Sequence, residues 1–293
     1  MTKILPIILV MFLWSACYPL ITVGIDYAPH LTFAAMRASL AGMVLLIAAK
    51  ALGHAMPHGR QIWIKLSSIG LGATTLGFFG MFHAAEYVSP GIATVINNTQ
   101  PLMAAVLAHM FLREYLTSPA RWGLIIGFLG IVTIAMPELS ISGTANGYLL
   151  GMAYIILAAF GVTVSNVLIR GMAGTMSGLS AMGWQLTLGS IPLWSMAFLW
   201  EDQSQVQWTG TFLFSLLGLA IFGTAFVYWL WFRVLERTPL TRANVFTFLV
   251  PIFGLSMGMM FFGESLTGWT AAGAALTLFG IYQVNRELKI KAA

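Results

Sequence analysis

The sequence predicts an all-α integral membrane protein whose ten transmembrane helices form two inverted five-helix repeats. Three observations predict this fold class: the composition, a sequence unit that occurs twice, and the placement of the charged residues. Of the 293 residues, 59% are hydrophobic and 8% are charged, whereas soluble domains carry about 25% charged residues. A lipid bilayer is therefore the solvent that suits this chain.

Apolar segments long enough to cross a bilayer follow one another along the chain. A helix needs about 20 mostly apolar residues to span about 30 Å of hydrocarbon. Short turns rich in Pro, Gly and polar residues separate these segments, for example at residues 54–60 and 201–207. We expect spans near residues 4–24, 31–50, 62–84, 91–112, 121–137, 147–169, 179–200, 210–232, 240–262 and 267–285.

The chain contains an internal repeat. A constant shift of 150 positions places Pro101 on Pro251 and Glu114 on Glu264, with several glycines matched between the following spans. We expect one repeat at residues 4–137 and the second at residues 147–285. The first span follows Lys3 and could be a cleaved signal peptide, but the repeat needs it as the first of five spans.

Charge is distributed unequally between the two faces that ten spans would create. All Lys and Arg residues except Arg37 fall in turns or ends on one face, and the other face holds only acidic residues among its charges. Cytoplasmic loops are rich in Lys and Arg, so we expect both termini in the cytoplasm, in a bacterial inner (plasma) membrane. The acidic face holds Asp26, Glu86, Glu138, Glu201, Asp202 and Glu264.

An odd number of spans per repeat requires the second copy to enter the membrane upside down. Inverted repeats are typical of secondary transporters, whose substrate site lies near the midplane between the halves and opens to each side in turn. Channels can also be built from inverted repeats, so a channel remains an alternative. The formal charge of +5 is expected to be loop charge, and not a sign of a nucleic-acid partner.

Two stretches of the chain resemble a known family. The run from Asn97 to Leu102, the run from Phe111 to Thr117 and the repeated run from Phe261 to Thr267 are similar to the EamA signature of the drug/metabolite transporter (DMT) superfamily. Within that superfamily the chain looks like the YddG-type exporters of aromatic and other amino acids. The resemblance implies ten helices, cytoplasmic ends and efflux of small metabolites.

Polar residues at membrane depth are costly and usually face a cavity or a neighbouring helix. Spans four and nine each carry polar residues ahead of a proline, Pro101 or Pro251, and proline frees a backbone carbonyl. These side chains either bind substrate or merely bond neighbouring helices. The candidate substrate-binding residues are Trp14, Ser15, Tyr18, Phe78, Phe79, His83, Asn97, Asn98, Gln100, Ser165, Tyr228, Trp229, Asn244 and Thr247.

A second group of residues is expected to serve gating or structure. Arg37 lies about 10 Å deep in its span, where it is expected to reach the surface or pair with Asp26 or Glu86; the alternative is a clamp for a substrate carboxylate. Small residues in spans five and ten favour close helix contact and a scaffold role. The gating or structural candidates are Arg37, Pro101, Pro251, Gly254 and Gly258.

Enzyme signatures are absent from the sequence. No phosphate-binding loop and no Gly-x-Ser-x-Gly motif occurs, and Pro57 interrupts the helical spacing of His54 and His58. We therefore expect no catalysis, no cofactor and no metal ion. The expected partners are a small-molecule substrate and membrane lipid, in a monomer or homodimer. The expected function is export of amino acids or related amphipathic metabolites by alternating access; a permease for drugs or other small metabolites, a channel and an intramembrane enzyme are the alternatives.

Overall fold

The computed structural model describes residues 4–84, 87, 97–141, 148–262 and 267–290. Throughout these residues the chain is α-helical or in short turns, with no β-strand. Each of the ten expected spans corresponds to a described helical segment, which confirms the predicted fold class. Four of the described helices are long and apolar enough by themselves to cross a membrane: His30–Ala51, Arg60–Met81, Leu149–Gly171 and Gly210–Arg237.

In the first repeat, the first, second and fifth spans are uninterrupted helices. The third span is divided by a π-helical segment, η1, and the fourth is described from residue 97 onward. The helices are α1 (Leu5–Ile25), α2 (His30–Ala51), α3 (Arg60–Ile69), η1 (Gly70–Leu76), α4 (Gly77–Ala84), α6 (Gln100–Leu112) and α7 (Ser118–Ile141).

The second repeat has the same plan. In this repeat, the eighth span of the chain is divided by a π-helical segment, η3, and the ninth span by a 3₁₀ segment, η4. The helices are α8 (Tyr148–Gly171), α9 (Gly178–Trp200), α10 (Gly210–Ala220), η3 (Ile221–Phe226), α11 (Val227–Arg237), α12 (Leu240–Val245), η4 (Phe246–Phe248), α13 (Leu249–Phe262) and α14 (Gly268–Ile290); a short 3₁₀ turn, η2 (Gln203–Gln205), lies between α9 and α10.

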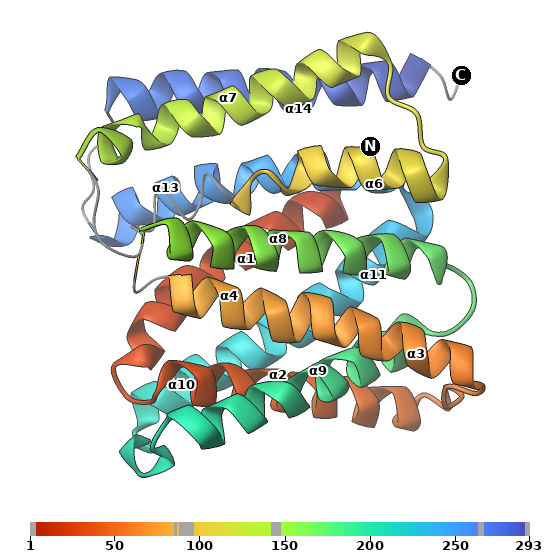
Figure 1. Ribbon diagram of the computed structural model, residues 1–293, viewed down its shortest axis with the longest axis vertical. Coiled ribbons are helices and arrows are strands. Elements are labelled where there is room, and N and C mark those ends of the chain that lie inside the picture. The colour runs from red at the N-terminus through yellow and green to blue at the C-terminus, as the bar shows by residue number, and fades with distance from the viewer. Residues whose placement is uncertain (1–3, 85–86, 88–96, 142–147, 263–266, 291–293) are drawn as a thin grey trace.

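Two helix pairs form opposite edges of the bundle. Figure 1 shows α7 beside α14 along one edge and α2 beside α9 along the other, with the remaining spans between them. Each pair takes one helix from each repeat, the fifth with the tenth and the second with the seventh. A Cβ atom on Gly280 would lie 2.5 Å from the carbonyl oxygen of Gly123, so these helices touch at their backbones, as the small residues of spans five and ten predict.

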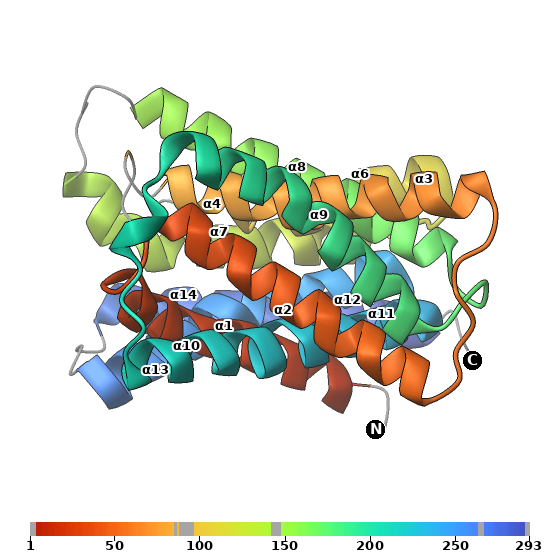
Figure 2. The same ribbon diagram turned by 90° about the horizontal axis from the view of Figure 1, so that it is seen from below.

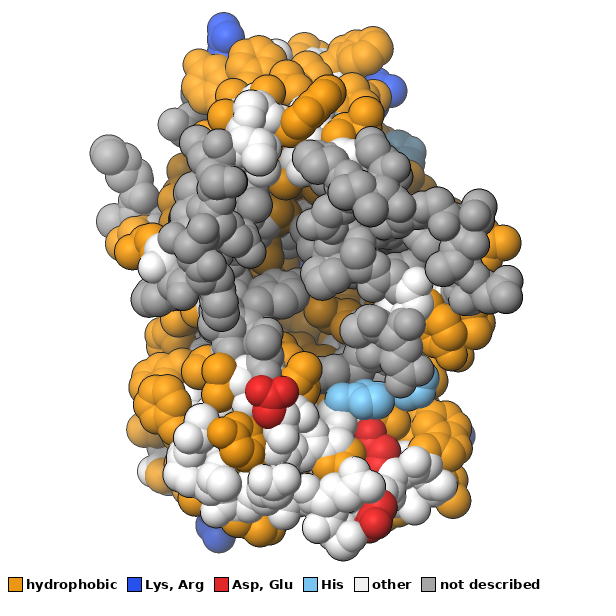
Figure 3. Space-filling model, turned by 90° about the vertical axis from the view of Figure 1, so that its left-hand side faces the viewer, with side chains coloured by type: hydrophobic (Ala, Val, Ile, Leu, Met, Phe, Trp, Pro, Cys, Tyr) orange, Lys and Arg blue, Asp and Glu red, His pale blue; other side chains and the backbone are white. Residues whose placement is uncertain are grey.

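The two repeats run in opposite senses. In Figures 1 and 2, α1 begins and α14 ends toward the same side of the bundle, which we call the termini face, whereas α8 begins at the opposite face. Figure 3 views that opposite face and shows acidic and histidine side chains gathered on it, with Lys and Arg only at its margin. The charge asymmetry read from the sequence is therefore an asymmetry between two real faces of the bundle.

The third and eighth spans widen into π-helix at matching positions of the two repeats, a feature that the sequence analysis did not predict. In η3 the wider turn lets the Thr224 hydroxyl donate to the Leu219 carbonyl at 2.9 Å. In η1 a Cβ atom on Gly72 would lie 2.5 Å from the Gly161 carbonyl oxygen. Such bulges occur often at functional sites, because they turn side chains away from the regular helical positions.

Candidate functional site

The fourth and ninth spans are interrupted at equivalent positions. In the ninth span, η4 separates α12 from α13 just ahead of Pro251. In the fourth span, residues 98 and 99 form a turn and α6 begins at Gln100, with Pro101 in its first turn. Proline has no amide hydrogen to continue a preceding helix and is tolerated in a first turn. Paired interrupted helices in two inverted halves mark the substrate region of secondary transporters.

Polar side chains stabilise both interruptions. The Gln100 side-chain amide donates to the Asn97 side-chain oxygen at 2.7 Å across the turn. In the ninth span the Thr247 hydroxyl donates to the Asn244 carbonyl at 2.8 Å. Asn98 is buried beside the first break. Three of the five predicted polar side chains of these spans, Asn97, Gln100 and Thr247, therefore form hydrogen bonds within their own span. This is what the alternative of helix packing, without substrate binding, predicts.

Ser15 joins the first span to the ninth. Its hydroxyl donates to the carbonyl of Val250, immediately before Pro251, at 3.2 Å. A Cβ atom on Gly254, one turn further along α13, would lie 3.5 Å from the same hydroxyl. Ser165 has a similar use, because its hydroxyl donates to Ile69 at 3.1 Å and to Gly161 at 2.8 Å. Both hydroxyls hold helices together.

Asn244 differs from the other polar candidates because its side chain has no partner. The residue is 1% exposed, and neither its amide nitrogen nor its amide oxygen has a hydrogen-bond partner in the part of the chain that the structure describes. Leaving a buried polar group unsatisfied costs about 1–3 kcal/mol. A native protein retains such a group where another molecule or another conformation completes it.

An aromatic pair lies between the first and eighth spans. The ring centroids of Trp14 and Trp231 are 5.3 Å apart, and the Trp231 indole donates to the buried side-chain oxygen of Asn166 in α8 at 2.9 Å. Trp14 is among the residues predicted from the sequence, whereas Trp231 and Asn166 are not. An Asn within the apolar sixth span, in the last third of α8, is the signal that could have indicated them.

The position of Arg37 corrects a prediction. The side chain neither reaches the surface nor pairs with Asp26: it is 6% exposed, and its Nε donates to the Thr224 hydroxyl at 2.7 Å. Its guanidinium carbon lies 4.9 Å from the centroid of the Phe78 ring. None of the ion pairs among the described residues includes Arg37, and Glu86 lies outside those residues. The physical reason is the π-helical turn of η3, which carries the hydroxyl that binds Arg37 in the interior.

The other predicted aromatic residues divide between two places. Phe79 and His83 belong to a cluster near the opposite face, where the His83 ring lies 4.3 Å from Phe79 and 5.5 Å from His30. Trp229 lines an apolar pocket of about 180 Å³ beside α2, with Val44 and Phe226 among its neighbours. Tyr228 is partly buried and packs against the hydrophobic core. The side chain of Tyr18 and the surroundings of Gly258 lie outside what the structure describes.

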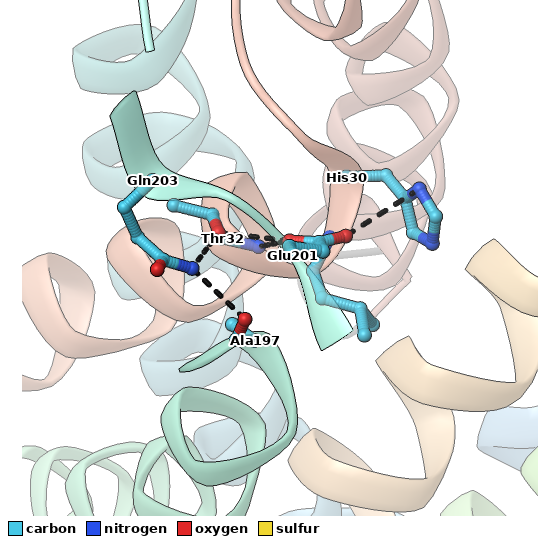
Figure 4. Close-up of polar contacts among 6 residues, drawn as sticks. His30, Thr32, Ala197, Glu201 and Gln203 are labelled. Carbon is cyan, nitrogen blue, oxygen red and sulfur yellow. Dashed lines mark hydrogen bonds and ion pairs between the residues drawn. The ribbon is translucent and has the colours of Figure 1, made fainter. Parts of the chain in front are cut away.

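Two carboxylates that the sequence analysis gave no role bind the starts of helices. At the opposite face, Glu201 accepts hydrogen bonds from the amides of Leu31 and Thr32, at 2.8 and 2.7 Å, and from the Thr32 hydroxyl at 2.8 Å. Figure 4 shows this group with Gln203, whose amide donates to Thr32, and with His30, whose Nδ1 lies 3.6 Å from the carboxylate. A carboxylate at a helix N-terminus also interacts favourably with the helix dipole.

The second carboxylate repeats this arrangement at the termini face. Glu114 accepts from the amides of Leu240 and Thr241, at 2.9 and 3.1 Å, and from the Thr241 hydroxyl at 3.0 Å. Each bound helix follows a proline in an extended conformation, Pro29 or Pro239. A Thr shortly after such a proline is the sequence signal that could have indicated both sites, although it does not identify the distant glutamates.

Comparison with known proteins decides the family. A model of the EamA-like transporter family matches the chain twice, at residues 1–136 and 149–286. The chain belongs to the EamA-like transporter family. The resemblance found in the sequence is thereby confirmed, and the two matches cover most of the chain.

EamA-like relatives occur in distant organisms. An uncharacterized transporter of Archaeoglobus fulgidus is 28% identical over 295 residues, which cover 98% of this chain and 100% of that protein. A WAT1-related chloroplastic protein of Arabidopsis thaliana is 28% identical over 86% of this chain, which spans only 62% of that longer protein. A probable amino-acid metabolite efflux pump of Salmonella typhimurium is 26% identical over 94% of this chain and 92% of that protein.

A solved structure shares the fold of this EamA-like protein. The crystal structure superimposes with a TM-score of 0.86 over 100% of this chain and 99% of that chain, at 18% sequence identity. At this identity the likeness concerns the fold alone.

Within the described residues of this chain, no group of three or more His, Cys, Asp or Glu side chains could hold a metal ion.

Proposed function

We propose that this EamA-like protein exports amino acids or related amphipathic metabolites that carry a carboxylate, by alternating access across a bacterial inner membrane. The observation that carries this proposal is the buried guanidinium of Arg37, which has no acidic partner among the described residues. The proposal also assigns both termini to the cytoplasm, because Lys and Arg gather at their face.

A buried positive charge that has no acidic partner among the described residues needs an anion. Removing one ion from water costs several kcal/mol even after relaxation, and a nearby opposite charge compensates for this cost. One Thr hydroxyl, the Cys17 sulfur at 4.0 Å and one aromatic ring satisfy only part of the guanidinium, whose planar fork matches a carboxylate. We propose that the substrate carboxylate completes this site.

The surroundings favour a substrate that is partly apolar. Phe78 lies against Arg37, and the Trp14–Trp231 pair lies between the first and eighth spans. Aromatic walls with a few convergent polar groups are typical of sites for small amphipathic molecules. The name of the Salmonella typhimurium relative, a probable amino-acid metabolite efflux pump, agrees with this substrate class.

The test compares matched substrates in proteoliposomes. We expect saturable transport of at least one radiolabelled amino acid from a panel, competition by the unlabelled amino acid, and no competition by the amine that lacks only the carboxylate. Tryptophan against tryptamine is one such pair. Transport without regard to the carboxylate would overturn the proposed substrate class, and no saturable amino-acid transport at all would favour a permease for drugs or other metabolites.

The matched variants are Arg37→Gln, Arg37→Lys and Arg121→Gln. Removing one partner of a buried charge pair costs about 2–5 kcal/mol, so Arg37→Gln should raise the KM for the amino acid at least about tenfold. Arg37→Lys keeps the charge but loses the planar fork and should fall between. Arg121 is exposed, and Arg121→Gln should transport as the unaltered protein does. An unchanged KM in Arg37→Gln would remove this residue from the site.

A further inference from the structure

The start of the ninth span is tied to three other spans at the termini face. Glu114, which follows α6, binds the first amides of α12. The Nε of Arg170 in α8 lies 3.9 Å from the same carboxylate, and its Nη1 donates to the carbonyls of Leu235 and Glu236 in α11, at 2.6 and 2.9 Å. One carboxylate thus connects the fourth span of the first repeat to the sixth, eighth and ninth spans of the second.

The helix bound by Glu114, α12, is separated from the rest of the ninth span by a break in the α-helix. α12 covers only Leu240–Val245, and η4 divides it from α13. A 3₁₀ segment inside a longer helix has poorer hydrogen-bond geometry and often marks a hinge. Pro251 follows close behind η4, so one helical hydrogen bond is missing there. α12 can therefore turn about η4 while α13 keeps its contact with Ser15.

Asn244 belongs to this short helix and is buried. It is three residues beyond Thr241, so both side chains project from the same side of α12, and Thr241 points to the Glu114 carboxylate. α12 packs against α6, where Ala104 and Ala108 are fully buried. The unpartnered Asn244 amide is consequently enclosed in the conformation that Glu114 holds.

We propose that Glu114 is a positioning residue that keeps α12 closed at the termini face, and that release of α12 exposes the Asn244 amide to bind substrate. A primary amide offers one acceptor and two donors, which suits the amino and carboxyl groups of an amino acid. This inference rests on the proposed function, because it assumes alternating access. It goes further by naming the residue that holds the termini face closed.

The opening is measured by the reactivity of a cysteine at position 244. In a Cys17→Ala background, which removes the single native cysteine, Asn244→Cys is exposed to a membrane-impermeant maleimide added at the termini face of everted vesicles. Glu114→Gln should raise the labelling rate at least about tenfold, the ratio that corresponds to about 1.4 kcal/mol. Glu114→Asp, which keeps the charge, should give a smaller increase.

Glu201→Gln is the matched control, because it weakens the same kind of bonds at the opposite face. It should leave the labelling rate unchanged. An equal increase in Glu201→Gln would show general loosening and would overturn the proposal, as would an unchanged rate in Glu114→Gln. Each variant is checked for monodispersity and melting temperature, so that a misfolded protein is not mistaken for an open one.

The role of Asn244 is tested separately with Asn244→Leu. If this amide only packs, replacing an unsatisfied polar group by an apolar one of similar size should be neutral or stabilising, with transport unchanged. The proposal expects an equal or higher melting temperature together with at least about a tenfold higher KM. Unchanged KM would overturn this part. Labelling needs no substrate, so the two proposals can fail separately. If Glu114→Gln raises the labelling rate but the unaltered protein transports no amino acid, the proposed function is refuted and the role of Glu114 stands.

Discussion

The helix starts bound by Glu201 and Glu114 use the same chemistry at opposite faces of the bundle. In both, one carboxylate accepts two backbone amides and a Thr hydroxyl, at 2.7–2.8 Å for Glu201 and 2.9–3.1 Å for Glu114. The difference lies in what is held. Glu201 directly follows α9 and binds α2, a 22-residue helix that packs along α9, whereas Glu114 binds a helix of six residues next to a break.

The role of a capping carboxylate therefore depends on the helix whose N-terminus it binds. When the bound helix is long and already packed on its neighbour, the cap adds stability to a scaffold. When the bound helix is short and hinged, the same bonds decide whether one side of the bundle is open. The side chain of Glu201 is also less exposed, at 9% against 15% for Glu114, as expected for a scaffold contact.

The largest effect on stability is expected when the carboxylate of Glu201 is removed. Glu201→Ala removes the acceptor of two amides and a hydroxyl, and hydrogen bonds to a charged group contribute about 1.5–3 kcal/mol each. We expect a loss of about 3 kcal/mol in the free energy of unfolding, measured as a lower melting temperature in detergent. Glu114→Ala should lower the melting temperature less, because its helix can move to solvent. An equal or larger loss in Glu114→Ala would contradict the comparison.

The next effect concerns binding from the termini face. If Glu114 holds most molecules closed, the apparent Kd for substrate added at that face is raised by the rarity of the open state. Glu114→Gln should therefore lower the apparent Kd about tenfold, measured by binding of a radiolabelled amino acid that the protein transports. Glu201→Gln serves as control and should bind as the unaltered protein does; tighter binding in both variants would argue against a specific gate.

A smaller effect separates the two Thr hydroxyls. Thr32→Val and Thr241→Val each remove one of the three hydrogen bonds to a glutamate; because the two amide bonds to the carboxylate remain, we expect a net loss of about 1 kcal/mol. Thr32→Val also leaves the Gln203 amide without one acceptor, and should act on the melting temperature alone. Thr241→Val should raise the labelling of Cys at position 244 about fivefold, the ratio that 1 kcal/mol provides. The reverse assignment of these two readouts would overturn the distinction.

The smallest effect is a pH dependence of the loop after Glu201. Hydrogen bonds from Ser204 lower the pKa of Asp202 below its ordinary value of 3.8. The unfolded chain therefore takes up this proton first, so the stabilisation is present above the ordinary pKa and is lost as the pH falls through the lowered one. Asp202→Asn should reduce the decline of the melting temperature in acid. An identical decline in both proteins would show that Asp202 does not contribute to the loss of stability in acid.

Much of the fold could be predicted because its signals are local. Hydrophobic length and turn residues place each span, and Pro101 and Pro251 indicate the interrupted helices four and nine. The site was harder to predict, because its contacts join residues far apart in the chain. Glu114 and Leu240 are 126 positions apart, and Arg37 and Thr224 are 187 apart. The sequence identified Arg37 but did not indicate that it is buried and bonded to Thr224; the expected pairing with Glu86 lies outside the described residues.

The sequence by itself determined the solvent, the number and order of the spans, and the opposite sense of the two repeats, since each follows from composition or from a periodic pattern. Only the tertiary structure decided which polar groups are satisfied. It showed that Ser15 and Ser165 bond neighbouring helices, and that Asn244 remains without a partner among the described residues. The physical reason is that a hydrogen bond requires atoms about 3 Å apart, and only the packed bundle sets such distances between separate spans.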